Sequence, residues 1–268
     1  MKDNFILSVS NLTVKTKEKK QILENVSFTI YPGEVVALTG LNGSGKSTIL
    51  KFIYRDNEKF DNSYFLEDGE ITFYNQDIFS LNDKELDTYH ENLVYIEQDD
   101  DFFKNLPFFF TIKDCIKAVL KYQELDWKLI ELKINSFFPK RDKQKEIKLS
   151  SSPRYMSGGE KKMLFIFLRI LANPHAKLFI IDEPLNNLDS INATKISDLI
   201  LSLHNQNPDS AILIVTHCRI ITCIKRAILI ENGKILEENG SFCCYNCYGD
   251  ANKNKFYGSE IDLFKSIN

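Results

Sequence analysis

A short apolar run, EVVALTG at 34–40, leads directly into the segment GLNGSGKST at 40–48, and this junction constrains the fold more than any other feature. The segment satisfies the phosphate-binding pattern G-x-x-x-x-G-K-[ST], whose fixed positions are Gly40, Gly45, Lys46 and Ser47. The apolar run predicts a buried strand before the loop, and a helix from Lys46 to about Tyr54 is predicted after it. This order predicts an α/β fold that binds a nucleoside triphosphate.

The chemistry of the loop depends on its backbone and on two side chains. Glycines let N–H groups curve around a phosphate, and the N-terminus of the following helix adds the positive end of its dipole. Lys46 is expected to reach the β- and γ-phosphates, and the Ser47 hydroxyl is expected to bind Mg²⁺. The expected nucleotide-binding residues are Gly40, Asn42, Gly43, Ser44, Gly45, Lys46, Ser47 and Thr48.

Two more buried runs, KLFIIDE at 177–183 and AILIVTH at 211–217, have polar residues at their carboxyl ends. Helical patterns lie between and after the runs, which predicts a parallel sheet covered on both faces. Ligands of such sheets bind at the carboxyl ends of the strands. Asp182 and Glu183 stand at such an end, where Asp182 could hold Mg²⁺ and Glu183 could orient or activate an attacking water.

Two other parts of the chain have different patterns. Polar and apolar residues alternate over 5–30 and 65–78, which predicts a small antiparallel sheet beside the main one. Residues 107–155 have helical patterning and no strong buried strand, which predicts an inserted helical lobe. We therefore expect one domain over residues 1–240, with a helical subdomain at about 100–157. A short C-terminal extension is expected over 241–268.

Charge and hydropathy narrow the possible partners. The net charge of −3 does not predict a broad surface for nucleic acid, so no nucleic-acid partner is expected. The N-terminal sequence MKDNFILSVS lacks the features of a secretory signal, and no apolar run approaches the roughly 18–20 residues of a membrane span. A cytoplasmic location is expected, and any membrane function would need another, membrane-spanning subunit.

Six cysteines are present, and three of them cluster as Cys243, Cys244 and Cys247. Cys244 and Cys247 have C-x-x-C spacing, but a zinc site usually needs a second pair, which the sequence does not offer. Reduced cytosolic thiols are the favoured interpretation, and metal or redox chemistry at the cluster is the alternative.

With these pieces in place, the sequence resembles the ATP-binding cassette (ABC) ATPases over about residues 5–240. GLNGSGKST resembles the Walker A loop and LFIIDEP the Walker B segment. The remaining family motifs follow in the family order. They are Glu97–Gln98, similar to the Q-loop; MSGGE at 156–160, similar to the family signature; NNLD at 186–189, similar to the D-loop; and IVTH, which ends at His217, similar to the switch histidine.

This resemblance implies a P-loop NTPase fold with a RecA-like parallel-sheet core, an antiparallel β subdomain and an inserted helical subdomain. It also implies a head-to-tail dimer of two cassettes, in which the signature of one caps the ATP bound by the other. The signature residues would be Ser157, Gly158, Gly159 and Glu160. A helix is predicted to start there and to end before Asn173, and its N-terminus would point at the γ-phosphate.

The resemblance implies further roles, residue by residue. Glu183 would activate water, His217 would contact the γ-phosphate, and Asp189 would communicate across the dimer. Mg²⁺ would be held by Ser47, Gln98 and Asp182, and Gln98 would also connect the site to the helical lobe. The cofactors implied are ATP and Mg²⁺. One departure from the family concerns the first hairpin, because no aromatic residue for stacking adenine stands near Thr16–Lys17.

The leading hypothesis is an ATPase subunit that powers translocation through a separate membrane permease, from the inner face of the cell membrane. The single short cassette resembles subunits of bacterial exporters, which favours export. The alternative is a soluble ABC ATPase without a transport role, such as one of iron–sulfur cluster assembly, which the SGGEKK segment also resembles. Two-cassette translation factors and coiled-coil chromosome ATPases fit less well, because one cassette and no heptad tract are present. The transported substrate, and whether the second cassette is identical, stay open.

Overall fold

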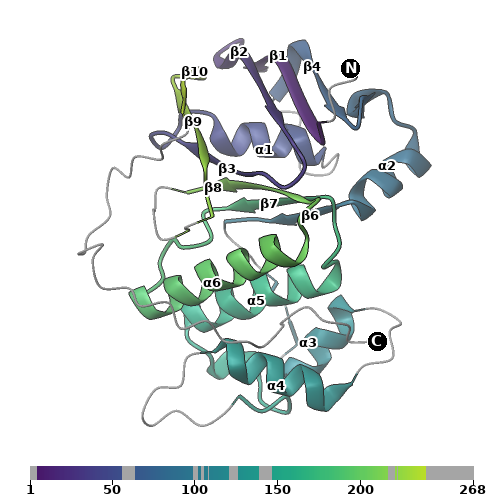
Figure 1. Cartoon of the computed structure of the whole chain (residues 1–268), viewed down its shortest axis with the longest axis vertical. Helices are drawn as coiled ribbons and strands as arrows, with labels where there is room; N and C mark the ends of the chain where they lie inside the picture. The colour runs from purple at the N-terminus through teal and green to yellow at the C-terminus, as the bar shows by residue number, and fades with distance from the viewer. Residues whose placement is uncertain are drawn as a thin grey trace.

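The computed structural model describes residues 5–55, 64–98, 102–103, 106–107, 109–120, 126–138, 147–216, 221 and 223–239 of the 268-residue chain. These residues form two sheets and six α-helices (Figure 1). The expected α/β class is confirmed.

The larger sheet has six strands in the order β10-β9-β3-β8-β7-β6. Its strands are β3 (Val35–Thr39), β6 (Leu93–Ile96), β7 (Leu178–Asp182), β8 (Ala211–Val215), β9 (Arg226–Glu231) and β10 (Lys234–Asn239). All neighbouring strands are parallel except β9 and β10, which form an antiparallel hairpin. The three apolar runs that predicted buried strands therefore lie side by side as β3, β8 and β7.

The smaller sheet is antiparallel and has the order β2-β1-β4-β5. Its strands are β1 (Leu7–Thr16), β2 (Gln21–Ile30), β4 (Tyr64–Phe73) and β5 (Gln76–Asp77). The alternating patterns at 5–30 and 65–78 predicted this sheet. In β1, buried side chains alternate with more exposed ones, so one face of the sheet packs inward and the other is solvated.

The helices are α1 (Lys46–Tyr54), α2 (Asp83–Glu91), α3 (Ile112–Val119), α4 (Trp127–Phe137), α5 (Gly158–Ala172) and α6 (Ser190–Gln206). Helix α1 lies between the two sheets, and α5 and α6 cover the opposite face of the larger sheet (Figure 1). Helices α3 and α4 pack beyond α5 and form the expected helical lobe, whose remaining residues lie partly outside the described ranges.

The larger sheet separates two apolar cores because successive side chains of a strand point to opposite faces. In β7, Phe179 and Ile181 pack with α5, α6 and the helical lobe. Leu178 and Ile180 pack with α1 and the smaller sheet. Each fully buried side chain of this size contributes about 1.5–3 kcal/mol, so the strands are held from both sides. Their carboxyl ends are consequently rigid places for functional groups.

Candidate functional site

The loop between β3 and α1 is shaped by close contacts with the chain's own backbone. Gly40 has φ +141°, and a Cβ at that position would lie 2.0 Å from the Ile230 carbonyl oxygen. Gly45 has φ +106°, and its Cβ would lie 2.5 Å from Leu23 Cδ2. L-residues with side chains rarely adopt these conformations, so both positions require glycine. Packing against β9 and β2 thus holds the loop in place.

The side chain of Lys46 is 6% exposed and bends back over this loop. Its Nζ donates to the carbonyl oxygens of Gly40, at 2.7 Å, and Leu41, at 3.0 Å. An ammonium group has three N–H donors, so one remains for an anion held by the loop. Burial lowers the pKa of Lys46, while the nearby carboxylates of Glu183 and Asp182 act in the opposite direction.

Asp182 ends β7 beside this lysine and lies against the start of α1. Ser47 donates a side-chain hydrogen bond to its carboxylate, and burial raises the pKa of Asp182. The carboxylate atom Oδ1 is buried and has no hydrogen-bond partner among the described residues. An unsatisfied buried carboxylate oxygen beside a hydroxyl suits a hard cation such as Mg²⁺, which prefers oxygen ligands. The side chains present therefore fit the expected metal.

Glu183 follows directly and has an unusual backbone conformation. Its φ is +46°, in the left-handed region, and its N–H donates to the Val215 carbonyl at 2.9 Å. Burial, and secondly the charge of Asp182, raise the pKa of the Glu183 carboxyl to about 7. Such a group can exchange a proton near neutral pH, as a general base must. A non-glycine residue in a strained conformation is a feature common at functional sites.

The second glycine-containing segment forms the N-terminus of α5. Ser157 caps this helix: its Oγ accepts from the Glu160 N–H at 3.3 Å, and Glu160 Oε2 accepts from the Ser157 N–H at 2.7 Å. This reciprocal capping box fixes the helix start at Gly158, where the sequence predicted it. The helix ends at Ala172, before Asn173, as predicted.

The two glycines of this segment have different surroundings. A Cβ added at Gly158 would meet no atom within 4 Å among the described residues. A Cβ at Gly159 would lie 3.2 Å from Asn192 Nδ2 and 3.3 Å from Leu188 Cδ2. Gly159 thus packs against the start of α6, whereas packing of the described chain does not require a glycine at 158.

Asp189 is the N-cap of α6 and lies close to the same place. Its Oδ1 accepts from the Asn192 N–H at 2.9 Å, and its Oδ2 accepts from Asn192 Nδ2 at 3.1 Å. Asn192 is buried, at 3% exposure. Asn192 therefore bonds to the cap of α6 and lies beside Gly159 at the start of α5, a placement that was not predicted from the sequence.

Three of the expected positions are less fully described. Glu97 and Gln98 follow the end of β6, and Gln98 is exposed. The charge of Glu97 acts on Asp182, which places this strand end near the site. His217 follows Val215 and Thr216 but lies outside the described residues, as do Cys243, Cys244 and Cys247. Within the described ranges, no group of three or more His, Cys, Asp or Glu side chains could hold a metal ion.

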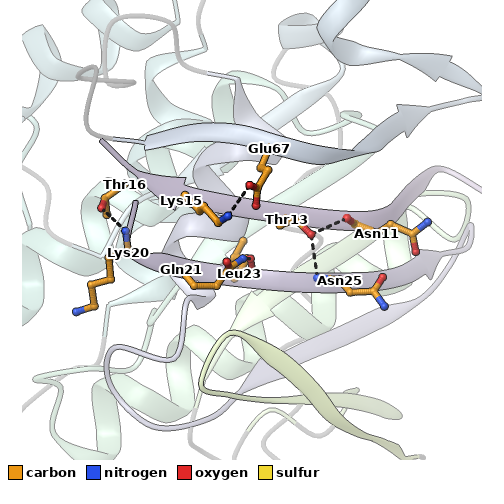
Figure 2. A network of polar contacts seen from close by, with 9 residues as sticks. All are labelled: Asn11, Thr13, Lys15, Thr16, Lys20, Gln21, Leu23, Asn25 and Glu67. Atoms are coloured by element: carbon orange, nitrogen blue, oxygen red, sulfur yellow. Dashed lines mark hydrogen bonds and ion pairs between the residues drawn. The ribbon is translucent and has the colours of Figure 1, made fainter. Parts of the chain in front are cut away.

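A network of polar contacts surrounds the end of the β1–β2 hairpin, where the resemblance implies an adenine contact (Figure 2). Lys15 pairs with Glu67 of β4, and the Lys20 N–H donates to Thr16 Oγ1 at 3.2 Å. Lys19 adopts φ +63° in the turn between the strands. No aromatic side chain stands in this turn, in agreement with the sequence.

Sequence analysis missed two structural supports of the site. The β9–β10 hairpin approaches the phosphate-binding loop, and the Gly233 N–H in its turn donates to the Ser44 carbonyl at 3.1 Å. Lys162 of α5 donates to the Glu183 carbonyl at 2.7 Å. The apolar run AILI at 227–230, followed closely by Asn232-Gly233, is a hairpin signal that could have indicated the first of these.

The fold and the juxtaposition of Lys46, Ser47, Asp182 and Glu183 define a P-loop nucleotide-binding protein. The family model described as "ABC transporter" matches residues 23–186. The chain therefore belongs to the ABC transporter family and is an ABC ATPase.

Individual relatives agree with this assignment. The phosphonates import ATP-binding protein PhnC of Fusobacterium nucleatum is 30% identical over 86% of this chain and 90% of its own length. The lipoprotein-releasing system ATP-binding protein LolD of Aquifex aeolicus is 29% identical over 81% of this chain and 91% of its own. The ATP-binding cassette MJ0796, solved as a dimer in a post-hydrolysis state with ADP and Pi, has a TM-score of 0.67. It is 22% identical over 87% of this chain and 98% of its own, and shares the fold.

Proposed function

We propose that this chain binds ATP and Mg²⁺ at the loop 40–48 and hydrolyses ATP in a dimer with a second cassette. The observation that supports this most directly is the meeting of four groups at the ends of β3 and β7. These are the backbone of the loop, the Lys46 ammonium, the Ser47–Asp182 pair and the Glu183 carboxylate. Parallel strands bring them together although Lys46 and Asp182 are far apart in the sequence.

The proposed roles follow from charge and position. The N–H groups of Gly43 to Gly45 and the free donor of Lys46 would hold phosphate oxygens. Ser47, Asp182 and Gln98 would hold Mg²⁺, which supplies positive charge against the phosphates when bound. Glu183 would take a proton from the attacking water, since its raised pKa favours accepting one. We assign His217 a contact with the γ-phosphate by resemblance alone.

The N-terminus of α5 would complete the site of the other cassette. The capping box provides acceptors for the N–H groups of Ser157 and Glu160 only. Other N–H groups of the first turn are therefore available to an anion. Gly158 leaves space for close approach by a ligand outside this chain. Asp189, which bonds to Asn192 beside Gly159, would carry changes across the dimer.

We further propose that hydrolysis drives transport through a separate membrane permease, with this chain bound at the cytoplasmic face. Within the described ranges, no helix is both long and apolar enough to cross a bilayer. The relatives named above are an import protein and a protein of a lipoprotein-releasing system. For this chain we propose export, on the resemblance of a single short cassette to exporter subunits. The domain is proposed to end near residue 240, with a short extension after it.

The catalytic proposal is tested with Glu183→Gln. This variant should bind ATP with unchanged affinity, lose turnover by at least about a hundredfold, and accumulate as an ATP-bound dimer. Nucleotide titration, phosphate release and size-exclusion chromatography measure the three outcomes. Glu70→Gln, on the exposed face of β4, is the matched control. Hydrolysis by Glu183→Gln at the parent rate would refute the assignment of the base.

The composite site is tested with Ser157→Arg. A bulky cation at the start of α5 should leave nucleotide binding by the single chain intact and abolish dimer-dependent hydrolysis. Ser150→Arg, at an exposed position before the signature, controls for the added charge. Equal hydrolysis by the two variants would remove the support for a site shared between chains.

The transport proposal is tested by isolating the chain under mild detergent and identifying what accompanies it. A multi-span membrane protein is the expected partner, and a soluble scaffold would instead support the iron–sulfur cluster alternative. Reconstitution of the complex in vesicles then decides direction. ATP supplied outside inverted vesicles should drive substrate inward if the system exports, and loss of preloaded substrate would show import.

A further inference from the structure

Helix α5 contacts the segment that follows β7 through one lysine. Lys162 Nζ donates to the Glu183 carbonyl oxygen at 2.7 Å and to the Asn186 carbonyl oxygen at 3.1 Å. The Asn186 N–H also donates to the Glu183 carbonyl at 3.2 Å, which closes a turn over residues 183–186. The lysine therefore bonds to the first and last carbonyl of that turn.

This turn holds Glu183 in a conformation that residues other than glycine rarely adopt. Its φ is +46°, and Pro184 follows it, although a residue before proline is ordinarily extended. A strained backbone persists only when surrounding contacts determine it. Contacts on both sides of Glu183 include the bond from its N–H to the Val215 carbonyl and the bonds from Lys162 and Asn186 to its own carbonyl.

We propose that Lys162 is a positioning residue for hydrolysis: its ammonium fixes the turn 183–186 and so aims the Glu183 carboxylate. The inference rests on the proposed role of Glu183. Lys162 acts through the backbone of Glu183, and its positive charge also lowers the pKa of the Glu183 and Asp182 carboxyls. Because it stands on the helix that begins at Gly158, it also connects the start of α5 to Glu183 of the same chain.

If Lys162 had only a structural role, its substitution would have different effects. Loss of a buried packing contact would lower the stability of the whole domain and would reduce nucleotide binding and turnover together. Loss of a positioning contact lowers kcat while KM for ATP is retained, because the loop and Lys46 are unchanged. The two interpretations are therefore separated by the ratio of the two kinetic constants and by local backbone opening.

The test compares Lys162→Met, which keeps an unbranched apolar stem, with Lys162→Arg, which keeps hydrogen-bond donors. Lys161→Met is the matched control on the same helix. In the full chain, Lys162→Met should lower kcat by about tenfold to a hundredfold with KM changed by less than about twofold. Lys162→Arg should recover part of the loss, and Lys161→Met should match the parent.

Hydrogen exchange provides the second readout. Peptides that cover residues 183–189 should exchange faster in Lys162→Met, whereas peptides from α1 should not change. Parent values of both kcat and exchange in Lys162→Met would overturn the inference, as would an equal loss of kcat in Lys161→Met. A general rise of exchange across the domain would assign Lys162 a structural role instead.

The same assays distinguish failure of this inference from failure of the proposed function. If Glu183→Gln retains turnover, the assignment of the base is wrong and the inference falls with it. If Glu183→Gln loses turnover while Lys162→Met keeps it, the proposed function stands and only the positioning role is lost.

Discussion

Two segments of this chain place glycines beside a serine at the start of a helix, and their surroundings differ sharply. The loop at 40–48 is enclosed: Gly40 and Gly45 touch the chain's own atoms, and Lys46 is buried. The segment at 157–160 is a capped helix end, and a Cβ added at Gly158 would meet no atom within 4 Å outside its own helix turn among the described residues. The first segment is built by the interior of its own chain, whereas the second leaves space for something else.

The difference shows that two similar sequence motifs can form different kinds of site. Positive φ angles at Gly40 and Gly45 require glycine whatever is bound. Gly158 and Gly159 begin an ordinary α-helix, where glycine costs about 1 kcal/mol relative to alanine. A glycine that the chain does not need for its own packing is better explained by a ligand or partner. Substitutions in and beside the two segments should separate these two kinds of glycine.

The largest effect is expected for Gly40→Ala. The new Cβ would meet the Ile230 carbonyl at 2.0 Å and would impose an unfavourable φ. Overpacking and backbone strain together should cost about 3 kcal/mol or more and remove nucleotide binding. Thermal melts and titration with a fluorescent nucleotide measure both. Gly43→Ala, with φ +79° and no neighbour within 4 Å, is the control and should lose much less stability.

Gly158→Ala should fold and bind nucleotide as a single chain. Its only harmful effect should be on hydrolysis, which we expect to fall by about tenfold or more in the proposed dimer, or about 1.4 kcal/mol in the barrier. Phosphate release measured against protein concentration detects this loss. Unchanged hydrolysis would show that the open space at Gly158 has no function in the dimer.

The neighbouring pair provides a finer comparison of stability. Gly158→Ala should be neutral or stabilising by up to about 1 kcal/mol, because alanine favours the helix and meets no described atom. Gly159→Ala gains the same propensity but crowds Asn192 and Leu188, so it should be about 1 kcal/mol less stable than Gly158→Ala. Denaturant unfolding of both variants measures the gap. Equal free energies of unfolding would show that the residues of this contact move aside for the new Cβ at little energetic cost.

The smallest effect concerns the carboxylates beside the first loop. The pKa of Glu183 is raised to about 7 in the folded chain, so ionisation of this group destabilises the nucleotide-free protein above that pH. The penalty disappears as pH falls below the unfolded pKa of about 4.5. Because the side chain is only partly buried, solvent screening reduces this penalty. Glu183→Gln should therefore raise the free energy of unfolding at pH 8 by roughly 1 kcal/mol, which corresponds to about 2–4 °C in Tm.

The gain from Glu183→Gln should shrink as the pH is lowered from 8 toward 5. Thermal melts without nucleotide, at a series of pH values, measure it. Glu160→Gln in the second segment keeps an acceptor for the Ser157 N–H and serves as the control. A gain that is independent of pH would mean that the substitution acts through packing and not through charge.

Much of the fold followed from local patterns in the sequence. A parallel strand that is covered on both faces needs apolar side chains on both. The run LFIID at 178–182 has this pattern and predicted β7 and its carboxyl end correctly. The helix from Gly158 to Ala172 was predicted from the signature segment and the apolar residues that follow it, which are adjacent in the sequence. The placement of Asp182 and Glu183 at a strand end followed directly.

The parts that were missed depend on contacts between distant segments. Nothing near Gly40 in the sequence indicates that Ile230 would lie against it, and nothing near Lys162 indicates the Glu183 carbonyl. Gly158 and Gly159 differ in the space around them because of how α6 packs, and the local sequence does not indicate this difference. Helix α2 is an exception, since its capping box consists of Asn82 and Glu85, which stand three residues apart in the sequence.

The open space at Gly158 has a consequence for inheritance. A chain altered only there would fold and take up nucleotide at least as well as the original, so cellular quality control would have no reason to remove it. It would accumulate to normal levels and compete with intact copies for a place in the proposed dimer. Such an allele would therefore act dominantly, whereas an allele that alters Gly40 would be lost with its own misfolded product and behave as recessive.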